Sequence, residues 1–460
     1  MGQILNDTIV ALATPPGRGG VGIVRLSGPL VPRMIELFIK RELKPRFAHY
    51  GPFYDEAGEK VDLGISLFFE APHSFTGEHV LELQGHGGPI IMDRLIRAAI
   101  KFGARMARPG EFTERAFCNN QLDLAQAEAI ADLINATSEQ AARCALRSLE
   151  GDFSKSIHNF LQGVIGLRTY LEASNDFPDE EVEILEGGEV ESRLSQLQED
   201  LTSLQAATKK GVVLQEGLQV AVVGKPNAGK SSLFNALTGD ETAIVTDIPG
   251  TTRDLIREKV LLGGHVIHLV DTAGIRQDAQ NIEEEGIRRA QRAAEKADHL
   301  LFVIDGSVYD TEDKRHTQLV QILGQQWLER FKNRLTMIVN KIDLTKKSPQ
   351  VLSSSQLYPQ VFISAREQSG VDLLRQHLSN HFGLQGTDEG QFIARRRHLE
   401  AMSRAKIALE QGIEQLNHTG AVELLAEDLR SVQLALDEVT GVFSQEDLLG
   451  EIFSSFCIGK

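Results

Sequence analysis

The stretch Leu218–Ser231, LQVAVVGKPNAGKS, decides the fold of the middle of the chain. Its first part, Leu218–Val223, is a continuous apolar run of the kind that forms a buried strand. Its second part, Gly224–Ser231, has the GxxxxGK[ST] pattern, and a helix is expected over Ser232–Leu237. Glycines let successive backbone N–H groups turn toward phosphate oxygens at the amino end of that helix. The stretch therefore predicts a P-loop nucleotide-binding domain.

Two residues of this loop have defined tasks in phosphate chemistry. Lys230 is expected to contact the β- and γ-phosphates and to act in catalysis, and Ser231 is expected to coordinate Mg²⁺. The other nucleotide contacts predicted in the loop are Asn227, Ala228, Gly229 and Ser232.

A second phosphate motif follows the apolar run His265–Val270. It reads Asp271-Thr272-Ala273-Gly274, with Asp271 where an acid linked to magnesium belongs. Gly274 stands where a backbone N–H can sense the γ-phosphate. Between the loop and this motif lies a Thr-rich switch segment over residues 246–254, TDIPGTTRD.

Two further motifs predict a guanine pocket. Met337–Val339 leads into Asn340-Lys341-Ile342-Asp343, and the Asp343 carboxylate can accept two hydrogen bonds from guanine N1 and N2, which adenine cannot donate. Val361–Ile363 then leads into Ser364-Ala365-Arg366, whose backbone would complete the pocket. Five motifs in this order, each after a strand, predict a GTP-binding domain.

The group that positions the attacking water has several candidates. Many GTPases place a Gln directly after the DTAG run, but Ile275 stands here and cannot orient water. The candidates are Gln277 and the run Glu283–Glu285. Arg253 and Arg276 are present, yet no arginine finger is identifiable, because most exposed arginines are simply solubilising.

Helical patterns flank the nucleotide-binding segment on both sides. Before it, apolar residues recur at helical spacing at Ile130, Leu133, Ile134, Leu146 and Leu149, and again at Val190, Leu194, Leu197, Leu201 and Leu204. After residue 390 the stripes are Leu399, Met402, Leu409, Ile413 and Leu416, and Val422, Leu425, Leu429, Val432, Leu436 and Val439. These stripes are expected to be core positions. Because neither set can bury its apolar face alone, we expect the two halves to pack together around an inserted domain.

Two local features belong to the first helical half. Asp123 and Gln126 form a candidate capping pair at a helix start. The stretch Asp176–Glu191 holds eight carboxylates and no Lys or Arg. It is interpreted as a solvated loop and helix start rather than a metal site, because no His is interleaved with the acids.

The first 120 residues alternate strand-like runs with Gly-rich turns. The expected strands are Ile9–Ala13, Gly22–Leu26, Leu63–Phe69 and Val80–Leu83, with a helix over Ile90–Phe102. The predicted architecture is multidomain, α/β plus all-α. Its parts are an amino-terminal α/β domain (1–119), a helical domain in two pieces (120–215 and 386–460) and an inserted Ras-like P-loop GTPase domain (216–385).

Composition excludes several classes of protein. A length of 460 residues suggests about three domains. Cys118, Cys144 and Cys457 are too few and too scattered for a disulfide framework or a zinc cluster. No run of about 20 apolar residues and no secretory signal is present, so a cytoplasmic protein without a membrane span is expected. The net charge of −16 argues against a general nucleic-acid coat, although it allows a local basic patch.

Seven short runs outside the nucleotide motifs are shared with a known family. They are DTIVA at 7–11, TPPGRGGVG at 14–22, FTGE at 75–78, LELQGHGG at 81–88, RPGEFTERAF at 108–117, LDLAQAEA at 122–129 and FCIGK at 456–460. Over its full length the chain resembles the bacterial and organellar tRNA modification GTPase family, MnmE, also called TrmE. Generic G proteins carry none of these runs.

The resemblance implies that the amino-terminal domain is similar to tetrahydrofolate-binding domains. Such a domain would bind a one-carbon folate, of the 5-formyl or 5,10-methylene type, across a homodimer. Arg25, Glu82 and Lys460 match the family's folate contacts. Gln121 stands where the family usually has Lys, which removes one positive charge from the folate's surroundings. Without the family, the Gly-rich turns could equally be only turns and Arg25 a surface residue.

The resemblance also implies that the nucleotide domains dimerise around a potassium ion near the phosphates. Asn227 matches its side-chain ligand, Thr252 would join Ser231 on Mg²⁺, and Glu283 matches the family's water-orienting carboxylate. A fixed monovalent cation supplies the positive charge that an arginine finger otherwise provides. The other potassium ligands implied by the match are carbonyls or hydroxyls of Thr246, Ile248 and Thr251.

Finally, the family works with a flavin- and NADH-using partner protein. Together they add a carboxymethylaminomethyl or aminomethyl group at C5 of the wobble uridine, position 34, of certain tRNAs. The implied assembly is a homodimer joined to that FAD-dependent partner in a heterotetramer. Cys457 is a candidate chemical participant, although a lone thiol in a tail is as often incidental. The competing interpretation is a ribosome-assembly or regulatory RNA-binding GTPase switch, which would lack the amino-terminal runs and the FCIGK terminus.

Overall fold

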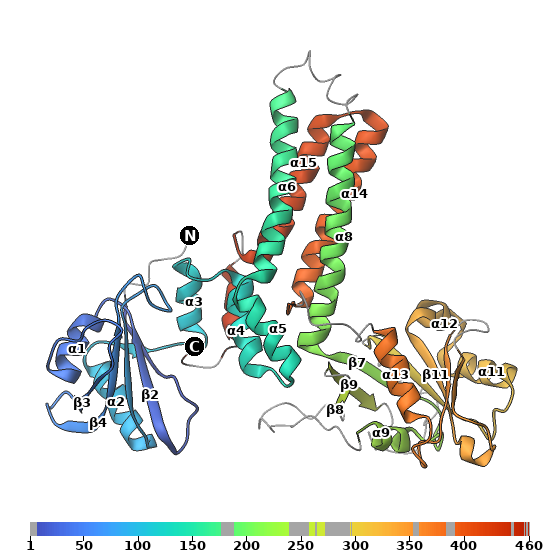
Figure 1. Ribbon diagram of the computed structural model, residues 1–460, viewed down its shortest axis with the longest axis horizontal. Coiled ribbons are helices and arrows are strands. Elements are labelled where there is room, and N and C mark those ends of the chain that lie inside the picture. The colour runs from blue at the N-terminus through green and yellow to red at the C-terminus, as the bar shows by residue number, and fades with distance from the viewer. Residues whose placement is uncertain are drawn as a thin grey trace. The chain divides into compact units, whose positions relative to one another are not determined.

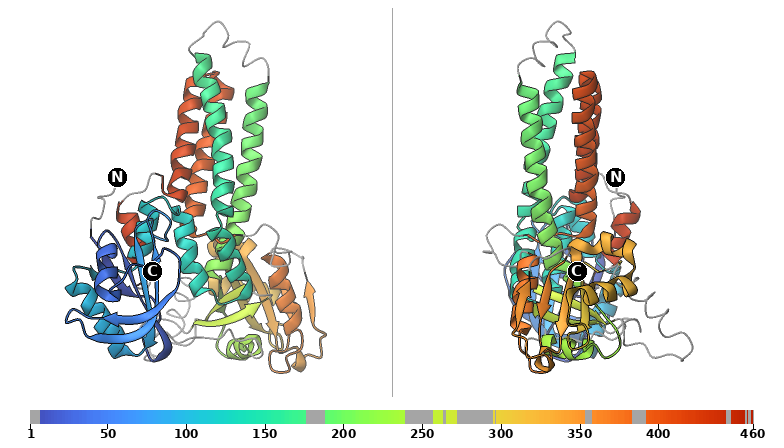
Figure 2. Two further views of the ribbon diagram at one scale, coloured as in Figure 1. Left: turned by 60° about the vertical axis from the view of Figure 1, so that its left-hand side comes forward. Right: turned by 90° about the vertical axis from the view of Figure 1, so that its right-hand side faces the viewer.

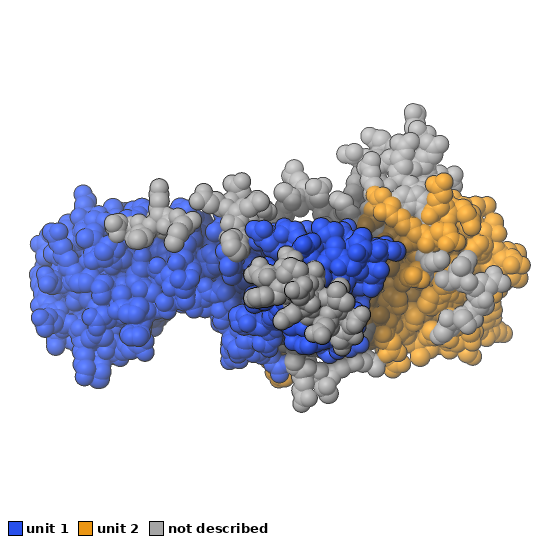
Figure 3. Space-filling model, turned by 90° about the horizontal axis from the view of Figure 1, so that it is seen from above, with its two compact units in different colours: residues 1–131, 146–205, 397–460 blue, residues 132–145, 206–396 orange. Residues whose placement is uncertain are grey.

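The structure is a computed structural model. It describes residues 7–175, 188–238, 257–262, 265–271, 295, 297–352, 358–382, 392–442, 446–454, 456 and 459. The chain forms two compact units: unit 1 holds residues 1–131, 146–205 and 397–460, and unit 2 holds residues 132–145 and 206–396 (Figure 3). In the described ranges no helix is long and apolar enough to cross a membrane. The polypeptide leaves unit 1 at residue 132 and again at residue 206, and the second, longer excursion contains the segment expected to be inserted, 216–385.

Unit 1 begins with a six-stranded mixed sheet of order β3-β4-β5-β2-β1-β6. Helices α1 (Val31–Ile39) and α2 (Pro89–Lys101) pack their apolar side chains into one core with this sheet (Figure 1). The predicted strands and helix are all present, whereas α1, α3 (Glu111–Cys118), β3 and β6 are additional. β6 is too short for a periodic pattern, and Gly51 and Pro52 interrupt β3. The strands are β1 (Ile9–Leu12), β2 (Gly19–Ser27), β3 (His49–Tyr54), β4 (Lys60–Phe69), β5 (Val80–Gly87) and β6 (Arg105–Met106).

A buried ion-pair network joins several of the shared runs. Arg115, which is 2% exposed, pairs with Asp7 at 2.7 Å and with Glu78 and Glu111 at 3.1 Å each. Arg105 reaches the same Glu111 carboxylate at 2.5 Å. Burial alone would raise the pKa of Glu111, but hydrogen bonds from Arg105, the Arg108 backbone and Arg115 lower it to about 2. These motif residues therefore stabilise the amino-terminal fold.

The helical part of unit 1 is built from chain segments that come before and after residues 206–396 in the sequence. Helices α6, α14 and α15 run side by side with the first part of α8 (Figures 1 and 2). Arg168 on α6 donates to Gln433 on α15 at 2.6 Å, and Arg397 and His398 of α14 both contact the buried Glu128 of α4. The prediction that the two halves pack together is therefore confirmed. The helices of the two flanking segments, of which residues 132–145, 206–216 and 396 belong to unit 2, are α3 (Glu111–Cys118), α4 (Leu124–Asn135), α5 (Glu139–Leu149), α6 (Asp152–Asn175), α8 (Glu189–Glu216), α14 (Arg396–Thr419), α15 (Val422–Thr440) and α16 (Glu446–Ser454).

The predicted stripes agree with the buried faces in part. All six residues of the α15 stripe are buried, as are those of α8 except the half-buried Leu204. On α14, Leu399 and Ile413 are only half buried. Gly412 is buried, and a Cβ there would lie 3.0 Å from Leu425 and Asp428 of α15, so the two helices approach closely at this point. The first stripe is wrong, because α4 and α5 bury small residues instead of its members. The residues actually buried on those two helices include Leu124, Ala127, Ala131, Ala141, Cys144 and Ala145.

The capping pair at the start of α4 is confirmed. The Gln126 backbone N–H donates to Asp123 Oδ1 at 2.8 Å, and the Asp123 backbone N–H donates to Gln126 Oε1 at 3.0 Å. Of the acidic stretch, residues 176–187 lie outside the described residues, and α8 begins at Glu189.

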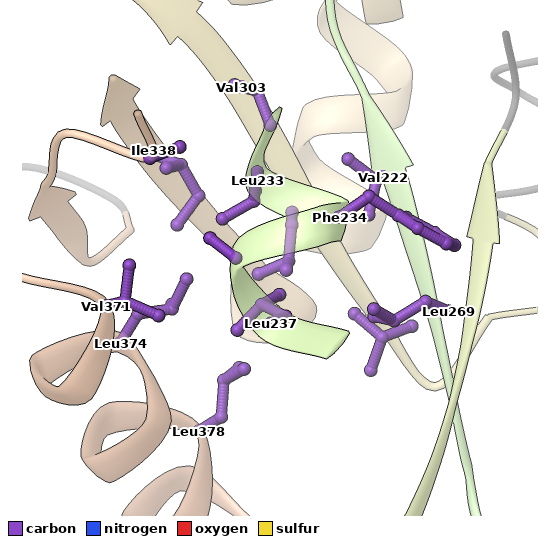
Figure 4. Close-up of a cluster of buried hydrophobic side chains, with 14 of the residues drawn as sticks. Val222, Leu233, Phe234, Leu237, Leu269, Val303, Ile338, Val371, Leu374 and Leu378 are labelled. Carbon is purple, nitrogen blue, oxygen red and sulfur yellow. The ribbon is translucent and has the colours of Figure 1, made fainter. Parts of the chain in front are cut away.

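Unit 2 contains a seven-stranded sheet of order β12-β13-β11-β10-β7-β9-β8. The five central strands are parallel, and β8 and β12 are antiparallel at the edges. Figure 4 shows Leu233 and Leu237 of α9 (Lys230–Thr238) in one core with Leu374 and Leu378 of α13 (Val371–His381). The strands are β7 (Leu218–Val223), β8 (Arg257–Leu262), β9 (His265–Asp271), β10 (His299–Asp305), β11 (Leu335–Asn340), β12 (Gln350–Leu352) and β13 (Gln360–Phe362), and the helices are α9 (Lys230–Thr238), α11 (Glu312–Leu323), α12 (Gln325–Phe331) and α13 (Val371–His381), with 3-10 turns at Lys332–Arg334 and Ile342–Leu344.

Candidate nucleotide-binding site

The predicted phosphate and base motifs lie at one edge of the sheet in unit 2. The P-loop follows β7, Asp271 ends β9, Asn340 ends β11, and Ser364 lies just beyond β13. Because these strands are parallel members of one sheet, their carboxyl ends reach the same edge. The topology therefore brings together motifs that are far apart in the sequence.

Two glycines of the P-loop pass too close to their neighbours to carry a side chain. A Cβ added at Gly224 would lie 2.2 Å from the Val303 carbonyl oxygen, and one added at Gly229 would lie 2.1 Å from Asn340 Nδ2. Gly229 also has a φ of +94°, in the left-handed region that favours glycine. The loop is thus held against β10 and β11.

Lys230 begins α9 and is buried at the centre of the loop. Its Nζ donates to the carbonyl oxygens of Gly224 and Lys225, both at 2.8 Å. Ser231 follows it and is exposed, as is Asn227, whose φ of +63° is a left-handed value that Asn tolerates. An ammonium group and exposed backbone at the amino end of a helix form an arrangement suited to phosphate oxygens.

Asn340 connects the P-loop with the loop after β13. Its side chain is 2% exposed, its Nδ2 donates to the Ala228 carbonyl oxygen at 3.0 Å, and its Oδ1 accepts from the Ala365 backbone N–H at 2.9 Å. Because both ends of the amide are used, its orientation is fixed. Asn340 therefore couples the phosphate and base regions of the site.

Asp343 fits the predicted contact with guanine. Its Oδ1 is buried and accepts no hydrogen bond from any residue in the described part of the chain. A buried acceptor without a donor costs about 1–3 kcal/mol. Guanine N1–H or N2–H would supply the missing donor, whereas adenine presents no such pair.

Asp305, at the end of β10, is a site residue that the sequence analysis does not identify. Its Oδ2 accepts a hydrogen bond from Lys341 Nζ at 2.6 Å. Burial raises the pKa of Asp305, but hydrogen bonds from Lys341 and Ser307 outweigh burial and hold the pKa below its usual value. The apolar run His299–Ile304, followed by Asp and Gly, is the signal that predicts this strand and its terminal acid.

Many predicted site residues lie outside the described residues. Asp271 is placed by its backbone as the last residue of β9, and Ser364 Oγ accepts from the Glu367 backbone N–H at 3.3 Å in the turn that also contains Ala365 and Arg366. The predicted residues outside the described ranges are Thr246, Ile248, Thr251, Thr252, Thr272, Ala273, Gly274, Gln277, Glu283, Cys457 and Lys460.

The residues matched to folate contacts lie in unit 1. Arg25 and Glu82 face each other across β2 and β5, with Arg25 Nε donating to Glu82 Oε1 at 2.9 Å. Gln84 donates to the other carboxylate oxygen at 3.2 Å. Gln121 is exposed after α3, and its Nε2 donates to the Asn119 carbonyl oxygen at 3.3 Å. The contacts of the described residues thus join Arg25 to Glu82 but join Gln121 to neither.

Known proteins share these features along the full chain. The family profile described as MnmE helical domain matches residues 124–457, and the one described as GTP-binding protein TrmE N-terminus matches residues 8–121. The chain belongs to the MnmE family of tRNA modification GTPases. It is therefore a GTP hydrolase, with a TrmE-type amino-terminal domain, a helical domain from two chain segments and an inserted P-loop GTPase domain.

Individual MnmE proteins match this chain from end to end. The tRNA modification GTPase MnmE of Ectopseudomonas mendocina is 52% identical over 457 residues, 99% of each chain. That of Pseudomonas paraeruginosa is 51% identical over 460 residues, 100% of each chain. Among solved structures, the G domain of the T. maritima FeoB iron transporter matches with 25% identity and a TM-score of 0.26, covering 36% of this chain and 98% of its own.

Proposed function

We propose that this MnmE-family chain hydrolyses GTP to drive a modification of tRNA. The modification is the addition of a carboxymethylaminomethyl or aminomethyl group at C5 of the wobble uridine, position 34, of certain tRNAs. A flavin- and NADH-dependent protein is the proposed partner. The observation that supports this function most strongly is the match over 99% of the chain to proteins named tRNA modification GTPase MnmE.

The proposed roles in GTP hydrolysis rest on the P-loop geometry for the described residues and on the family match for the others. Lys230 stabilises the negative charge of the β- and γ-phosphates, and Asp343 binds the guanine base. Glu283, which matches the family's water-orienting carboxylate, orients the attacking water, and this fits the absence of a Gln at Ile275. Ser231 and Thr252 hold Mg²⁺, which offsets phosphate charge when bound. The other proposed contacts are Asn227, Ala228, Gly229, Ser232, Asp271, Thr272, Ala273, Gly274, Asn340, Lys341, Ser364, Ala365 and Arg366.

Potassium is the proposed second cation. Asn227 is exposed, and none of the described residues forms a hydrogen bond with its side chain. Its amide oxygen is therefore available to a monovalent cation beside the phosphates. The other proposed ligands are Thr246, Ile248 and Thr251.

The amino-terminal domain is proposed to bind a one-carbon tetrahydrofolate of the 5-formyl or 5,10-methylene type. A guanidinium and a carboxylate side by side on β2 and β5 match a ligand that carries both carboxylates and ring N–H donors. The proposed contacts are Arg25, Glu82, Gln121 and Lys460. Cys457 is proposed as a chemical participant in the modification.

The proposed assembly is a cytoplasmic homodimer that joins its flavin-dependent partner in a heterotetramer. The proposed domain boundaries are 1–119, 120–215, 216–385 and 386–460.

The experiment that tests this function is mass spectrometry of tRNA nucleosides. Cells lacking the gene, the same cells complemented with this chain, and cells complemented with an Asp343→Asn variant are compared. We expect the C5 modification of the wobble uridine to return only with the unaltered chain. Identical profiles in all strains, with a defect in ribosome assembly instead, would favour a regulatory GTPase.

A further inference from the structure

The connection between α1 and β3 (Figure 1) carries exposed side chains that none of the roles proposed above uses. Residues 40–50, KRELKPRFAHY, hold four Lys or Arg and one Glu, whereas the whole chain has 64 Asp or Glu against 48 Lys or Arg. Phe47 is 58% exposed and Tyr50 is 69% exposed. We call the exposed side chains of this segment the basic-aromatic surface; they are Lys40, Arg41, Lys44, Arg46, Phe47 and Tyr50.

The positive charges of this surface are not neutralised by acidic neighbours. Elsewhere in the same domain, exposed arginines pair with carboxylates, such as Arg94 with Asp55 at 2.6 Å. Within the described part of the chain, no carboxylate forms an ion pair with any cation of the basic-aromatic surface. Lys44 Nζ instead lies 4.0 Å from the centre of the Phe47 ring. The surface is therefore a local source of positive potential on an acidic protein.

The segment is fixed to the sheet rather than free in solvent. The Arg46 backbone N–H donates to the Phe68 carbonyl oxygen at 2.7 Å, and Arg46 Nη2 donates to the His73 carbonyl oxygen at 3.0 Å. Lys40 and Arg46 adopt left-handed φ values of +57° and +62°, which side-chain-bearing residues keep only where their surroundings impose them. A partner would lose little conformational entropy by ordering this backbone.

We propose that the basic-aromatic surface binds a single-stranded segment of RNA. Lys and Arg side chains would lie along its phosphates, and Tyr50, whose ring makes no ring or cation contact with any described residue, would stack under a base. An acidic protein partner would also pair with the cations, but its carboxylates would not account for the exposed rings of Phe47 and Tyr50. The inference rests on the proposed function, since that function takes an RNA with an unpaired loop as substrate.

The test measures binding of the full-length protein to a labelled stem-loop RNA and to a duplex RNA without the loop. The main variant is Arg41→Glu with Lys44→Glu. The control is Arg97→Glu with Lys101→Glu on α2, which makes the same change of charge at exposed positions of the same domain. We expect the main variant to bind the stem-loop about tenfold more weakly than the control. Its plot of log K against log salt should be shallower by about 1.4, since each lost contact to single-stranded phosphate contributes about 0.7.

The aromatic part is tested separately. We expect Tyr50→Ala to weaken stem-loop binding about fivefold or more with an unchanged salt slope, and Tyr50→Phe to retain it, because the ring and not the hydroxyl stacks. Unfolding midpoints and basal GTP hydrolysis check the fold. Should the charge reversal unfold the domain, Arg41→Gln with Lys44→Gln replaces it.

Three results would overturn the inference. One is equal binding by the main and control variants. Another is an equal loss of duplex and stem-loop binding on Tyr50→Ala. The third is a change from dimer to monomer in light scattering with unchanged RNA affinity, which would make this surface a contact between copies. None of these changes the wobble-nucleoside profile of cells complemented with the unaltered chain, so the proposed function is judged independently.

Discussion

Asn340 Nδ2 donates a hydrogen bond to the Ala228 carbonyl oxygen at 3.0 Å, so the last residue of β11 holds the P-loop directly. Replacing Asn340 by Ala would leave the Ala228 carbonyl and the Ala365 N–H without their partner. Since a buried polar group without a partner costs about 1–3 kcal/mol, we expect a lower unfolding midpoint and weaker GTP binding. Denaturant unfolding and titration with fluorescent GTP measure the two effects.

The same contact makes a second variant informative. Gly229→Ala puts a Cβ 2.1 Å from Asn340 Nδ2 at a φ of +94°, so it should displace Asn340 and weaken GTP binding about tenfold or more. The control is Gly166→Ala in α6, where a Cβ meets nothing within 4 Å. Normal GTP binding by the Gly229→Ala protein would contradict the proposed coupling.

Asp343→Asn should change which base the site accepts. An amide in place of the carboxylate loses one of two acceptors for guanine N1–H and N2–H and presents a donor to that side of the base. We expect GTP binding to weaken at least about a hundredfold, and xanthosine triphosphate, which carries an oxygen at C2, to bind relatively better. Competition among nucleotides measures the order of preference. If GTP affinity stays the same, Asp343 does not contact the base.

The nucleotide motifs were predictable from sequence because each is a local pattern with its own backbone requirement. Gly224 and Gly229 mark the close approaches of the P-loop, and the apolar runs before the motifs mark parallel strands. Asp305 was not found, because its role comes from Lys341, which follows a different strand, β11. An ion pair of that kind can be identified only when the order of the strands in the sheet is known.

The helical stripes show a second limit. Large apolar residues predicted the buried face of α15 correctly, since that helix packs along its length against α6. They failed on α4, where Ala127 and Ala131 are buried and Ile134 is 45% exposed. Small residues are buried where helices approach closely, and a pattern that counts only large side chains does not register them. The basic-aromatic surface likewise depends on which charges lack a partner, which a sequence does not show.

Acid should destabilise unit 2 through His299. This side chain is 1% exposed, hydrogen-bonds Thr336 through Nε2 at 2.9 Å, and faces His377, His381 and Arg334. Burial, with the nearby positive groups, lowers the pKa of His299 to about 3 from 6.5. Below pH 6.5 the unfolded chain therefore binds a proton that the folded chain does not, and stability falls as the pH drops toward 3.

The expected loss from His299 alone is about 2 kcal/mol at pH 5 relative to pH 7.5. His299→Gln should flatten this dependence, because the amide keeps a polar contact to Thr336 without titrating. His418→Gln is the control, since that ring lies exposed at the end of α14. Denaturant midpoints of the three proteins between pH 7.5 and 5 provide the measurement. Equal slopes for His299→Gln and the unaltered chain would show that His299 does not titrate in this way.

Hydrolysis should depend on the monovalent cation. A potassium ion held by Asn227 would stabilise the charge that develops on the phosphates, and smaller Na⁺ would fit the same ligands poorly. We expect faster GTP turnover in K⁺ than in Na⁺ at equal ionic strength. Asn227→Ala should remove the difference in turnover between the two salts. Equal rates in the two salts with the unaltered chain would exclude the potassium mechanism.

Restoring a positive charge at residue 121 should strengthen folate binding. The Gln121 side chain is exposed, and among the described residues it hydrogen-bonds only the Asn119 carbonyl oxygen, so Lys fits there without displacing a buried group. A new cation about 4 Å from a folate carboxylate contributes about 1 kcal/mol in water, equivalent to about fivefold in affinity. Calorimetric titration with 5-formyltetrahydrofolate compares Gln121→Lys with Gln162→Lys, the same change at an exposed position of α6. Equal affinities for the two variants would place residue 121 outside the folate site, whereas Arg25→Ala should still abolish binding if the pair on β2 and β5 holds the ligand.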